Sequence, residues 1–542
     1  MKTIVFLYVA SKSKYQFEKS FNSQSAFDLS LSWASKIENN SEIAVLTDKS
    51  EETAVNNAVS DFKKNGTFAN VTVASEEWTT SKMLHFLATK TESVKADFVV
   101  YSFGNCPFLD IDLTREVVSS HIKYLSEYTF ADGYPYGFAP EVIASGALNI
   151  ISSLADGIQK SEGDKEVSKT SIFSVMKGDI NSFEIETVIA PKDWRLLRLD
   201  FSCSTKSNYI ACKELYEIAK KTNAPFTSQP LSEIAEKSAE VQQTVPAFYN
   251  IQISSSCKGT CKYCPYPKEY KNKYGFLPNN IPGNENKAMG LEQFKSIVSQ
   301  ISALSENAVV GLSAWGEALE APDFEKYIEE VLKYEGLSVL IETDGTLVTT
   351  ELASKISSIG KSNKISWIIS IDAFTEKKYN TMHGFEENSM EKSNYSKAVD
   401  SISILEEYFA GNVYPQFLRV NENEDELEGF YRFYHEKSNA SKGNLIIQKF
   451  DSFCGLLKDE KPADLSPLER NTCWHIKRDM TILQDGSVPL CREHLLEGTI
   501  GNVLTEGLES VWKKFRPFVK AQIEKKYENK CGGCDEYYTF NF

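Results

Sequence analysis

Apolar runs of strand length alternate with amphipathic segments of helix length over most of this 542-residue chain. In the N-terminal part, the expected strands are residues 3–9, 43–46, 71–74 and 98–101. Polar segments long enough for helices separate these runs, which is typical of a largely parallel sheet covered on both faces. The pattern predicts an α/β domain, Rossmann-like, over residues 1–227.

The same alternation continues through the middle of the chain, where six further strands are expected at residues 248–253, 308–312, 337–341, 365–371, 413–420 and 445–450. The segments between them carry apolar residues at helical spacing, as at Leu291, Phe294, Ile297, Val298 and Ile301. Six βα repeats predict a partial (βα)6 TIM barrel, which we place at residues 247–460. The polar stretch between Pro230 and Pro246 predicts a linker, residues 228–246, that carries a short helix.

Composition limits the class of protein. The net charge is −16, and 42% of the residues are hydrophobic, which is ample for ordinary globular cores. Nucleic-acid binding needs a concentrated basic face, and no run of lysine and arginine supplies one, so we expect no nucleic-acid partner. The apolar part of residues 1–10 is at the lower limit for a signal peptide, and no apolar stretch approaches the roughly 20 residues that cross a bilayer. We therefore expect a cytoplasmic protein without a membrane segment.

The eleven cysteines are odd in number and clustered, which suits metal or iron–sulfur ligation better than a disulfide framework. Cys257, Cys261 and Cys264 come directly after the first barrel strand, at the end of the barrel where chemistry is assembled. A [4Fe–4S] cluster normally takes four thiolates, so three leave one iron open to an outside ligand. A zinc knuckle or a set of core thiols is the alternative that this spacing leaves open.

The spacing of these cysteines, with Tyr263 just before the last one, resembles the signature of radical S-adenosylmethionine (radical SAM) enzymes. The resemblance implies that S-adenosylmethionine chelates the open iron and that Tyr263 lies against this cofactor. An electron, from a reducing partner such as flavodoxin or ferredoxin, would cleave the sulfonium. The products would be methionine and a 5′-deoxyadenosyl radical that abstracts a hydrogen atom from a substrate.

Polar motifs follow the barrel strands in the order in which this family uses them. Gly316 and Glu317 resemble the Gly-Glu motif that holds the methionine amino group by charge-assisted hydrogen bonds. Ser370 and Asp372 resemble the Ser-x-Asp pattern that binds the ribose hydroxyls and the carboxylate region, and residues two apart on a strand point to one side. Arg419 is a candidate partner for the methionine carboxylate, or else part of an ordinary surface ion pair.

A second cysteine module, predicted as a small α+β domain over residues 461–542, contains Cys473, Cys491, Cys531 and Cys534. With Gly486 five residues before Cys491, this module resembles the SPASM/Twitch extension of radical SAM enzymes. Four thiolates complete one [4Fe–4S] cluster, so the resemblance implies one auxiliary cluster that is closed to substrate. A structural zinc on the same four thiolates is the alternative. Residues 481–491 are expected to form a hairpin that turns at Asp485-Gly486.

A weaker resemblance, to cytidylyltransferases of GT-A-like fold that make activated sugars and polyols, is carried by residues 103–110, 134–142 and 198–202. That family holds a divalent cation on two aspartates, but Asn105 and Ser202 stand at those positions. The glycine-rich loop that would cradle the triphosphate reads Ala-Ser-Lys-Ser-Lys-Tyr at residues 10–15, without a glycine. We therefore expect a degenerate domain that binds a substrate or partner, or serves as a scaffold.

Four cysteines remain. Cys106, Cys203 and Cys212 are expected to be buried core thiols. For Cys454, just beyond the sixth barrel strand, a core position and an approach to the substrate cavity are both open.

Together the motifs predict a radical SAM enzyme of oxidoreductase or maturase type with an auxiliary cluster, similar in layout to spirochaete SPASM proteins. Auxiliary clusters in relatives can accept the electron left on an oxidised product, which implies a two-electron oxidation or a radical cross-link. The substrate class stays open between a peptide, a protein and a carbohydrate or nucleotide-linked small molecule. Two alternatives are a nucleotidyltransferase acting on a sugar or polyol phosphate, opposed by Asn105 and Ser202, and a non-catalytic metal-binding protein, opposed by the open three-cysteine site.

Overall fold

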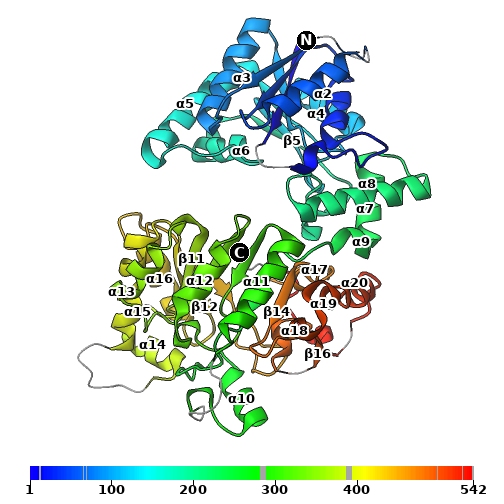
Figure 1. Ribbon diagram of the computed structural model, residues 1–542. Coiled ribbons are helices and arrows are strands. Elements are labelled where there is room, and N and C mark those ends of the chain that lie inside the picture. Colours follow the sequence, from blue (N-terminus) through cyan, green and yellow to red (C-terminus); the bar gives the residue numbers. More distant parts are fainter. Residues whose placement is uncertain are drawn as a thin grey trace. The chain divides into compact units, whose positions relative to one another are not determined.

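The computed structural model divides into two compact units, residues 1–244 and 245–542. Figure 1 shows the first unit in blue to green and the second in green to red. The structure describes residues 1–10, 14–64, 66, 68, 70–280, 288–385, 393–496, 498–527 and 529–539. In these ranges no helix is both long and apolar enough to cross a membrane.

The first unit is built on a seven-stranded sheet in the order β3-β2-β1-β4-β6-β5-β7. The strands are β1 (Thr3–Val9), β2 (Asn40–Thr47), β3 (Val71–Ser75), β4 (Phe98–Phe103), β5 (Tyr128–Asp132), β6 (Glu141–Ala144) and β7 (Ile185–Ile189). Strands β1 to β4 pair in parallel, whereas β6 runs antiparallel to β4 and β5. Every residue of β1 is buried, as a strand covered on both faces requires. The predicted Rossmann-like layer is confirmed.

Helices cover both faces of this sheet. Val5 and Leu7 of β1 pack with α1 (Ala26–Ala34), α2 (Glu52–Lys64), α4 (Ile111–Tyr124), α7 (Lys206–Thr222) and α8 (Ser228–Lys237). Ile4 and Phe6 pack on the other face with α3 (Thr80–Val94), α5 (Ser145–Glu162) and α6 (Ser171–Met176). The stretch expected as a linker forms α8 and α9 (Ala239–Gln242), and its apolar residues, among them Leu231 and Val241, belong to the core of the first unit.

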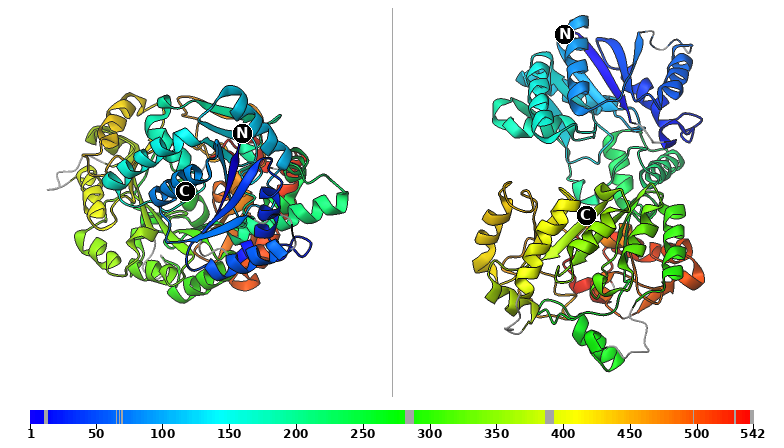
Figure 2. Two further views of the ribbon diagram at one scale, coloured as in Figure 1. Left: turned by 90° about the horizontal axis from the view of Figure 1, so that it is seen from above. Right: turned by 60° about the vertical axis from the view of Figure 1, so that its left-hand side comes forward.

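The second unit contains a parallel sheet in the order β13-β12-β11-β10-β9-β8-β14. The six predicted strands are present as β8 (Phe248–Ile251), β9 (Ala308–Gly311), β10 (Leu337–Thr343), β11 (Ile365–Ser370), β12 (Val413–Arg419) and β13 (Ile446–Lys449). Helices follow the strands as α10 (Tyr266–Tyr274), α11 (Leu291–Ser305), α12 (Phe324–Leu332), α13 (Thr350–Ser357), α14 (Glu376–His383), α15 (Asn394–Tyr408) and α16 (Leu427–His435). Figure 2 shows green to yellow helices outside the strands, and the predicted partial barrel is confirmed.

The C-terminal module comprises α17 (Trp474–Arg478), β14 (Asp479–Ile482), β15 (Ser487–Pro489), β16 (Thr499–Asn502), α18 (Val503–Glu506), α19 (Leu508–Lys513) and α20 (Arg516–Ile523). Helices α18 and α19 contact α11, beside which the orange and red module lies in Figure 1. The hairpin expected at residues 481–491 is wrong in its pairing. The chain does turn at Gly486, but β14 pairs in parallel with β8 and β15 pairs with β16. All four residues of β14 are buried, which the edge of the barrel provides and an isolated hairpin does not.

Candidate functional site

The loop after β8 brings three thiols together. A Cβ atom added at Gly259 would lie 3.3 Å from the sulfur of Cys261 and 3.7 Å from that of Cys257, so both thiols face the same side of this glycine. Cys264 is close enough to both that its charge raises their pKa values further, after burial. The loop is anchored by the Lys262 amide, which donates a hydrogen bond to the carbonyl of Met382 at 3.0 Å. Three candidate ligands therefore converge at the end of the first barrel strand.

In the described part of the chain, Asp451, Asp535 and Glu536 have ligand atoms that all lie within 4.8 Å of one another. These carboxylates belong to the second unit, where Asp535 and Glu536 directly follow Cys534.

A histidine that the sequence analysis did not assign to the site lies beside these thiols. His383, the last residue of α14, is fully buried, and its Nδ1 atom is 3.7 Å from the sulfur of Cys261. The hydroxyl of Tyr263 is 3.4 Å from the same imidazole nitrogen, and the ring of Tyr379 stacks on the histidine with centroids 4.2 Å apart. Burial lowers the pKa of His383. The contact with Cys261 spans so many residues that local spacing could not reveal it.

The Gly-Glu motif after β9 is held against the cysteine loop. Gly316 has φ +88°, and an added Cβ would lie 2.3 Å from the carbonyl oxygen of Ser254, so this close approach requires glycine. The buried carboxylate of Glu317 accepts a hydrogen bond of 2.7 Å from the hydroxyl of Thr343 on β10. Burial raises the pKa of Glu317 to about 8, and its charge in turn raises the pKa of Cys257. A carboxylate therefore lies next to the three-thiol loop.

The other predicted cofactor contacts differ in their surroundings. Asp372 is fully buried, has φ +56° and accepts a hydrogen bond of 2.6 Å from the Leu418 amide. The strand alternation expected to align Ser370 with Asp372 does not reach Asp372, because β11 ends at Ser370. Arg419 forms an ion pair with Glu424, with 2.7 Å between Nε and Oε2. The surface ion pair, one of the two possibilities for Arg419, is thus present.

The C-terminal module brings four more thiols together from distant points of the sequence. Cys473 precedes α17, Cys491 follows β15, and Cys531 lies in a short turn with Cys534, whose amide donates to the Cys531 carbonyl. Burial is the largest cause of the raised pKa of Cys491. The charges of Glu493, Cys473, Cys534 and Cys531 raise this pKa further. The Glu536 amide donates a hydrogen bond of 3.3 Å to the sulfur of Cys534, as thiolate ligands often receive. These thiols can hold a second cluster.

Charged side chains that are buried or half-buried lie between the two cysteine groups, among them Arg492, which flanks the candidate ligand Cys491. The guanidinium of Arg492 lies 3.4 Å from the carboxylate of Glu493 and 4.0 Å from that of Asp451. Burial raises the pKa of Cys264 to about 11, and the charge of Arg492 offsets part of this rise. Burial and the nearby Glu493 raise the pKa of Asp451 to about 9. A single arginine that follows a candidate ligand of the second group thus influences a candidate ligand of the first.

In the first unit, the structure brings Asn105 and Ser202 to one place, since the amide of the next residue, Cys203, donates a 2.8 Å hydrogen bond to the Asn105 carbonyl. The nearby carboxylate of Asp200 accepts a 2.6 Å bond from the Ser202 hydroxyl and pairs with Lys169 at 3.0 Å. The Asp200 carboxylate, next to Ser202, is therefore paired with the ammonium of Lys169. Of the loop at residues 10–15, residues 11–13 lie outside the described part.

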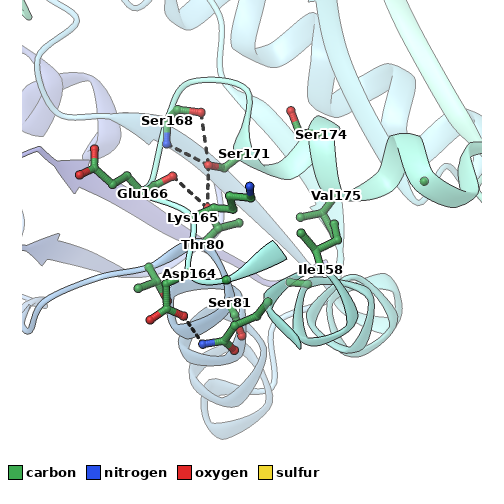
Figure 3. Close-up of a pocket in the computed structure, with 15 residues that line it drawn as sticks. Thr80, Ser81, Ile158, Asp164, Lys165, Glu166, Ser168, Ser171, Ser174 and Val175 are labelled. Carbon is green, nitrogen blue, oxygen red and sulfur yellow. Dashed lines mark hydrogen bonds between the residues drawn. The ribbon is translucent and has the colours of Figure 1, made fainter. Parts of the chain in front are cut away.

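A cavity of about 510 Å³ in the first unit is lined by Thr79, Thr80, Ser81, Ala155, Ile158, Gln159, Gly163, Asp164, Lys165, Glu166, Ser168, Ser171, Ser174, Val175 and Gly178. Figure 3 shows the hydroxyl groups of Thr80, Ser168 and Ser171 turned toward one another. The Thr80 hydroxyl is 3.0 Å from that of Ser171 and donates to the carbonyl of Glu166 at 3.1 Å. These polar groups satisfy one another.

Comparison with known proteins agrees with this geometry. The radical SAM superfamily profile matches residues 251–434, and the iron–sulfur cluster-binding SPASM domain profile matches residues 473–535. An uncharacterised protein of Treponema pallidum is 34% identical over 381 residues, which are 68% of this chain and 98% of that protein.

Two solved structures show more distant similarity. The S-adenosylmethionine-bound SuiB of Streptococcus suis is 14% identical, with a TM-score of 0.40 over 60% of this chain and 82% of that one. A cytidylyltransferase of Leptospira borgpetersenii is 14% identical, with a TM-score of 0.36 over 45% of this chain and 97% of that one. On the strength of the two domain profiles and the full-length relative, the chain belongs to the radical SAM superfamily, carries a SPASM domain, and has S-adenosylmethionine and [4Fe–4S] clusters as its cofactors.

Proposed function

We propose that this protein cleaves S-adenosylmethionine reductively at a [4Fe–4S] cluster held by Cys257, Cys261 and Cys264. The 5′-deoxyadenosyl radical that this cofactor supplies would remove a hydrogen atom from a substrate. The observation that supports the proposal most is the convergence of three thiols of one loop beside the buried carboxylate of Glu317. Three thiolates leave one iron of the cubane open for the cofactor.

Each predicted contact has a defined role in this proposal. Glu317 would hold the cofactor's amino group in its ionised form, for which Thr343 keeps the carboxylate in place. Tyr263 would lie against the cofactor, and Ser370 and Asp372 would bind its ribose and carboxylate region. Arg419 would bind the methionine carboxylate only after its ion pair with Glu424 breaks. This contact therefore requires a rearrangement of the side chain.

For the second cysteine group we propose one auxiliary [4Fe–4S] cluster on Cys473, Cys491, Cys531 and Cys534. It would accept the electron left on the oxidised product, giving a two-electron oxidation or a radical cross-link. Iron and acid-labile sulfide should be counted on anaerobically reconstituted protein, together with zinc. About eight irons per chain are expected for two clusters, whereas about four irons with one zinc would contradict the auxiliary cluster.

The main test is the cleavage of S-adenosylmethionine. Reconstituted protein with dithionite should release 5′-deoxyadenosine, and the Cys261→Ala variant should release none because the radical-forming cluster loses a ligand. Cys212→Ala, in the core of the first unit, is the matched cysteine control and should keep the wild-type rate. If the wild type released no 5′-deoxyadenosine although its cluster was reduced, the enzyme proposal would fail.

We further propose that the first unit binds a partner or substrate, with a carbohydrate or nucleotide-linked molecule as one candidate and a peptide or protein as the others. The Lys169–Asp200 ion pair supports a loss of cation-dependent nucleotidyl transfer, since hard cations need free oxygen anions. Pyrophosphate release from cytidine triphosphate and magnesium would contradict this. A cytoplasmic location with flavodoxin or ferredoxin as reductant suits free thiols and oxygen-sensitive clusters.

A further inference from the structure

We propose that a basic face around α20 is the place where an acidic one-electron carrier protein, such as a flavodoxin, docks and takes an electron from the auxiliary cluster. The inference rests on the auxiliary cluster proposed above and names the surface at which the partner of that site binds. This α20 face consists of the five exposed lysines that belong to α20 or flank it, Lys513, Lys514, Lys520, Lys525 and Lys526.

Positive charge is concentrated at this point of an otherwise acidic chain. Residues 510–530 contain seven lysines and arginines and two glutamates, whereas the whole chain has a net charge of −16. Lys513 pairs with Glu509 at 2.7 Å and Lys526 with Glu524 at 2.8 Å, but exposed ion pairs of this kind contribute little to stability. A protein with carboxylates on its surface therefore meets complementary charge at the α20 face.

The buried side of the same helix contacts the auxiliary site. Val519 and Gln522 of α20 are buried, whereas Lys520 between them in the sequence is exposed. The side-chain oxygen of Gln522 accepts a hydrogen bond of 2.9 Å from the amide of Cys473, a candidate ligand of the cluster. One helix thus touches the auxiliary site on one side and presents lysine to solvent on the other.

A cavity of about 420 Å³ brings a second candidate ligand to this face. Its lining includes Cys531 together with Lys514, Phe518, Gln522 and Lys526. Cys531 is only partly buried, so a ligand of the proposed cluster reaches the surface among these lysines. Electron transfer between proteins becomes slower as the distance between the redox centres grows. A carrier that docks on the α20 face would therefore lie close to the cluster.

The transfer moves one electron and makes no covalent bond between the two proteins. The auxiliary cluster, reduced by the electron left on the oxidised product, gives up that electron and returns to its oxidised state. The flavin of an oxidised flavodoxin takes the electron together with one proton from water and becomes the one-electron-reduced flavin. The carrier then leaves, and the cluster can accept an electron in the next turnover.

The test measures how tightly oxidised flavodoxin binds full-length reconstituted protein, by isothermal titration calorimetry at about 0.1 M salt, where charges more than about 10 Å apart are largely screened. Lys520→Glu combined with Lys526→Glu should weaken binding by at least about tenfold, because two attractive charges become repulsive. Glutamine at the same two positions should weaken binding less. Lys36→Glu combined with Lys63→Glu, at exposed positions of the first unit, changes the net charge equally and should keep the wild-type affinity.

Three results would overturn the docking face: no binding of flavodoxin to the wild type, equal loss of affinity in both pairs of glutamate variants, or a DNA duplex that binds as tightly as flavodoxin and is lost with Lys520→Glu and Lys526→Glu. Circular dichroism and the iron content of each variant separate loss of docking from loss of the fold. If the wild type bound flavodoxin but held zinc in place of the auxiliary cluster, the electron transfer would be overturned while the docking face would stand.

A second measurement follows the electron itself. Full-length protein that carries Cys257→Ala, Cys261→Ala and Cys264→Ala holds the auxiliary site alone, so its reduced form reports that cluster. Stopped-flow mixing with oxidised flavodoxin should yield the one-electron-reduced flavin, at least about tenfold more slowly when Lys520→Glu and Lys526→Glu are added. Equal rates with and without these two substitutions, or no flavin reduction in either protein, would contradict electron transfer through the α20 face.

Discussion

At the scale of single residues, backbone conformation and contact across the chain shape the site. Gly316 combines a positive φ with a backbone approach that leaves no room for a Cβ. His383 lies beside Cys261, a cysteine that is far away in the sequence. The spacing of Cys257, Cys261 and Cys264 is visible in eight consecutive residues. A contact between residues far apart in the sequence depends instead on how the chain folds.

Gly316→Ala should weaken S-adenosylmethionine binding by at least about tenfold, because the loop must move away from Ser254 and takes Glu317 with it. Isothermal titration calorimetry of reconstituted protein measures the change. Gly360→Ala is the matched control, since Gly360 has φ +84° and open space around it. If both variants bound the cofactor as the wild type does, the close approach at Gly316 would have no role in binding.

At the scale of elements, strands were predictable where their apolar runs were long, and their pairing was less so. All six barrel strands occur where the pattern placed them, and so do β1 to β4 of the first unit. The short strands β5 to β7 were missed, because fewer of their residues are buried and their pattern is weaker. The pairing of β14 with β8 joins strands that are far apart in the chain, and periodicity carries no information about such partners.

One strand residue makes the first unit sensitive to pH. Glu141 of β6 lies opposite Tyr101 of β4. Burial raises the pKa of the Glu141 carboxyl to about 7, although its hydrogen bond with Tyr128 acts in the opposite direction. In the unfolded chain the carboxyl ionises near its ordinary value. The folded state is therefore favoured at low pH, and this contribution is lost as the pH rises to about 7.

Glu141→Gln should remove that loss and stabilise the first unit at pH 8 by on the order of 2 kcal/mol relative to the wild type, with little difference at pH 4. Urea unfolding followed by circular dichroism at a series of pH values gives the comparison. Glu77→Gln, at an exposed position, is the control. Parallel pH profiles for the wild type and Glu141→Gln would contradict the cost of burying this charge.

At the scale of the whole molecule, the chain has two units with separate cores. The candidate cluster ligands all belong to residues 245–542, whereas Cys106, Cys203 and Cys212 are buried in the first unit. A bound cluster stabilises only the unit that binds it. The two units should therefore respond differently to loss of iron.

Anaerobic removal of iron by a chelator should lower the unfolding temperature of the second unit by several degrees and leave that of the first unit in place. Differential scanning calorimetry before and after chelation resolves the two transitions. The unfolding of a fragment with residues 1–244 identifies which transition belongs to the first unit. Equal shifts of both transitions would mean that the two units unfold together.

The sequence alone was sufficient to predict the fold class, the barrel strands and the two groups of cysteines, because periodicity and ligand spacing are local properties of a chain. Folding was needed to place His383 beside Cys261 and β14 on the edge of the barrel. Each of these is a contact between distant segments. Such contacts follow from packing the whole core, in which every strand and loop limits where the others can lie.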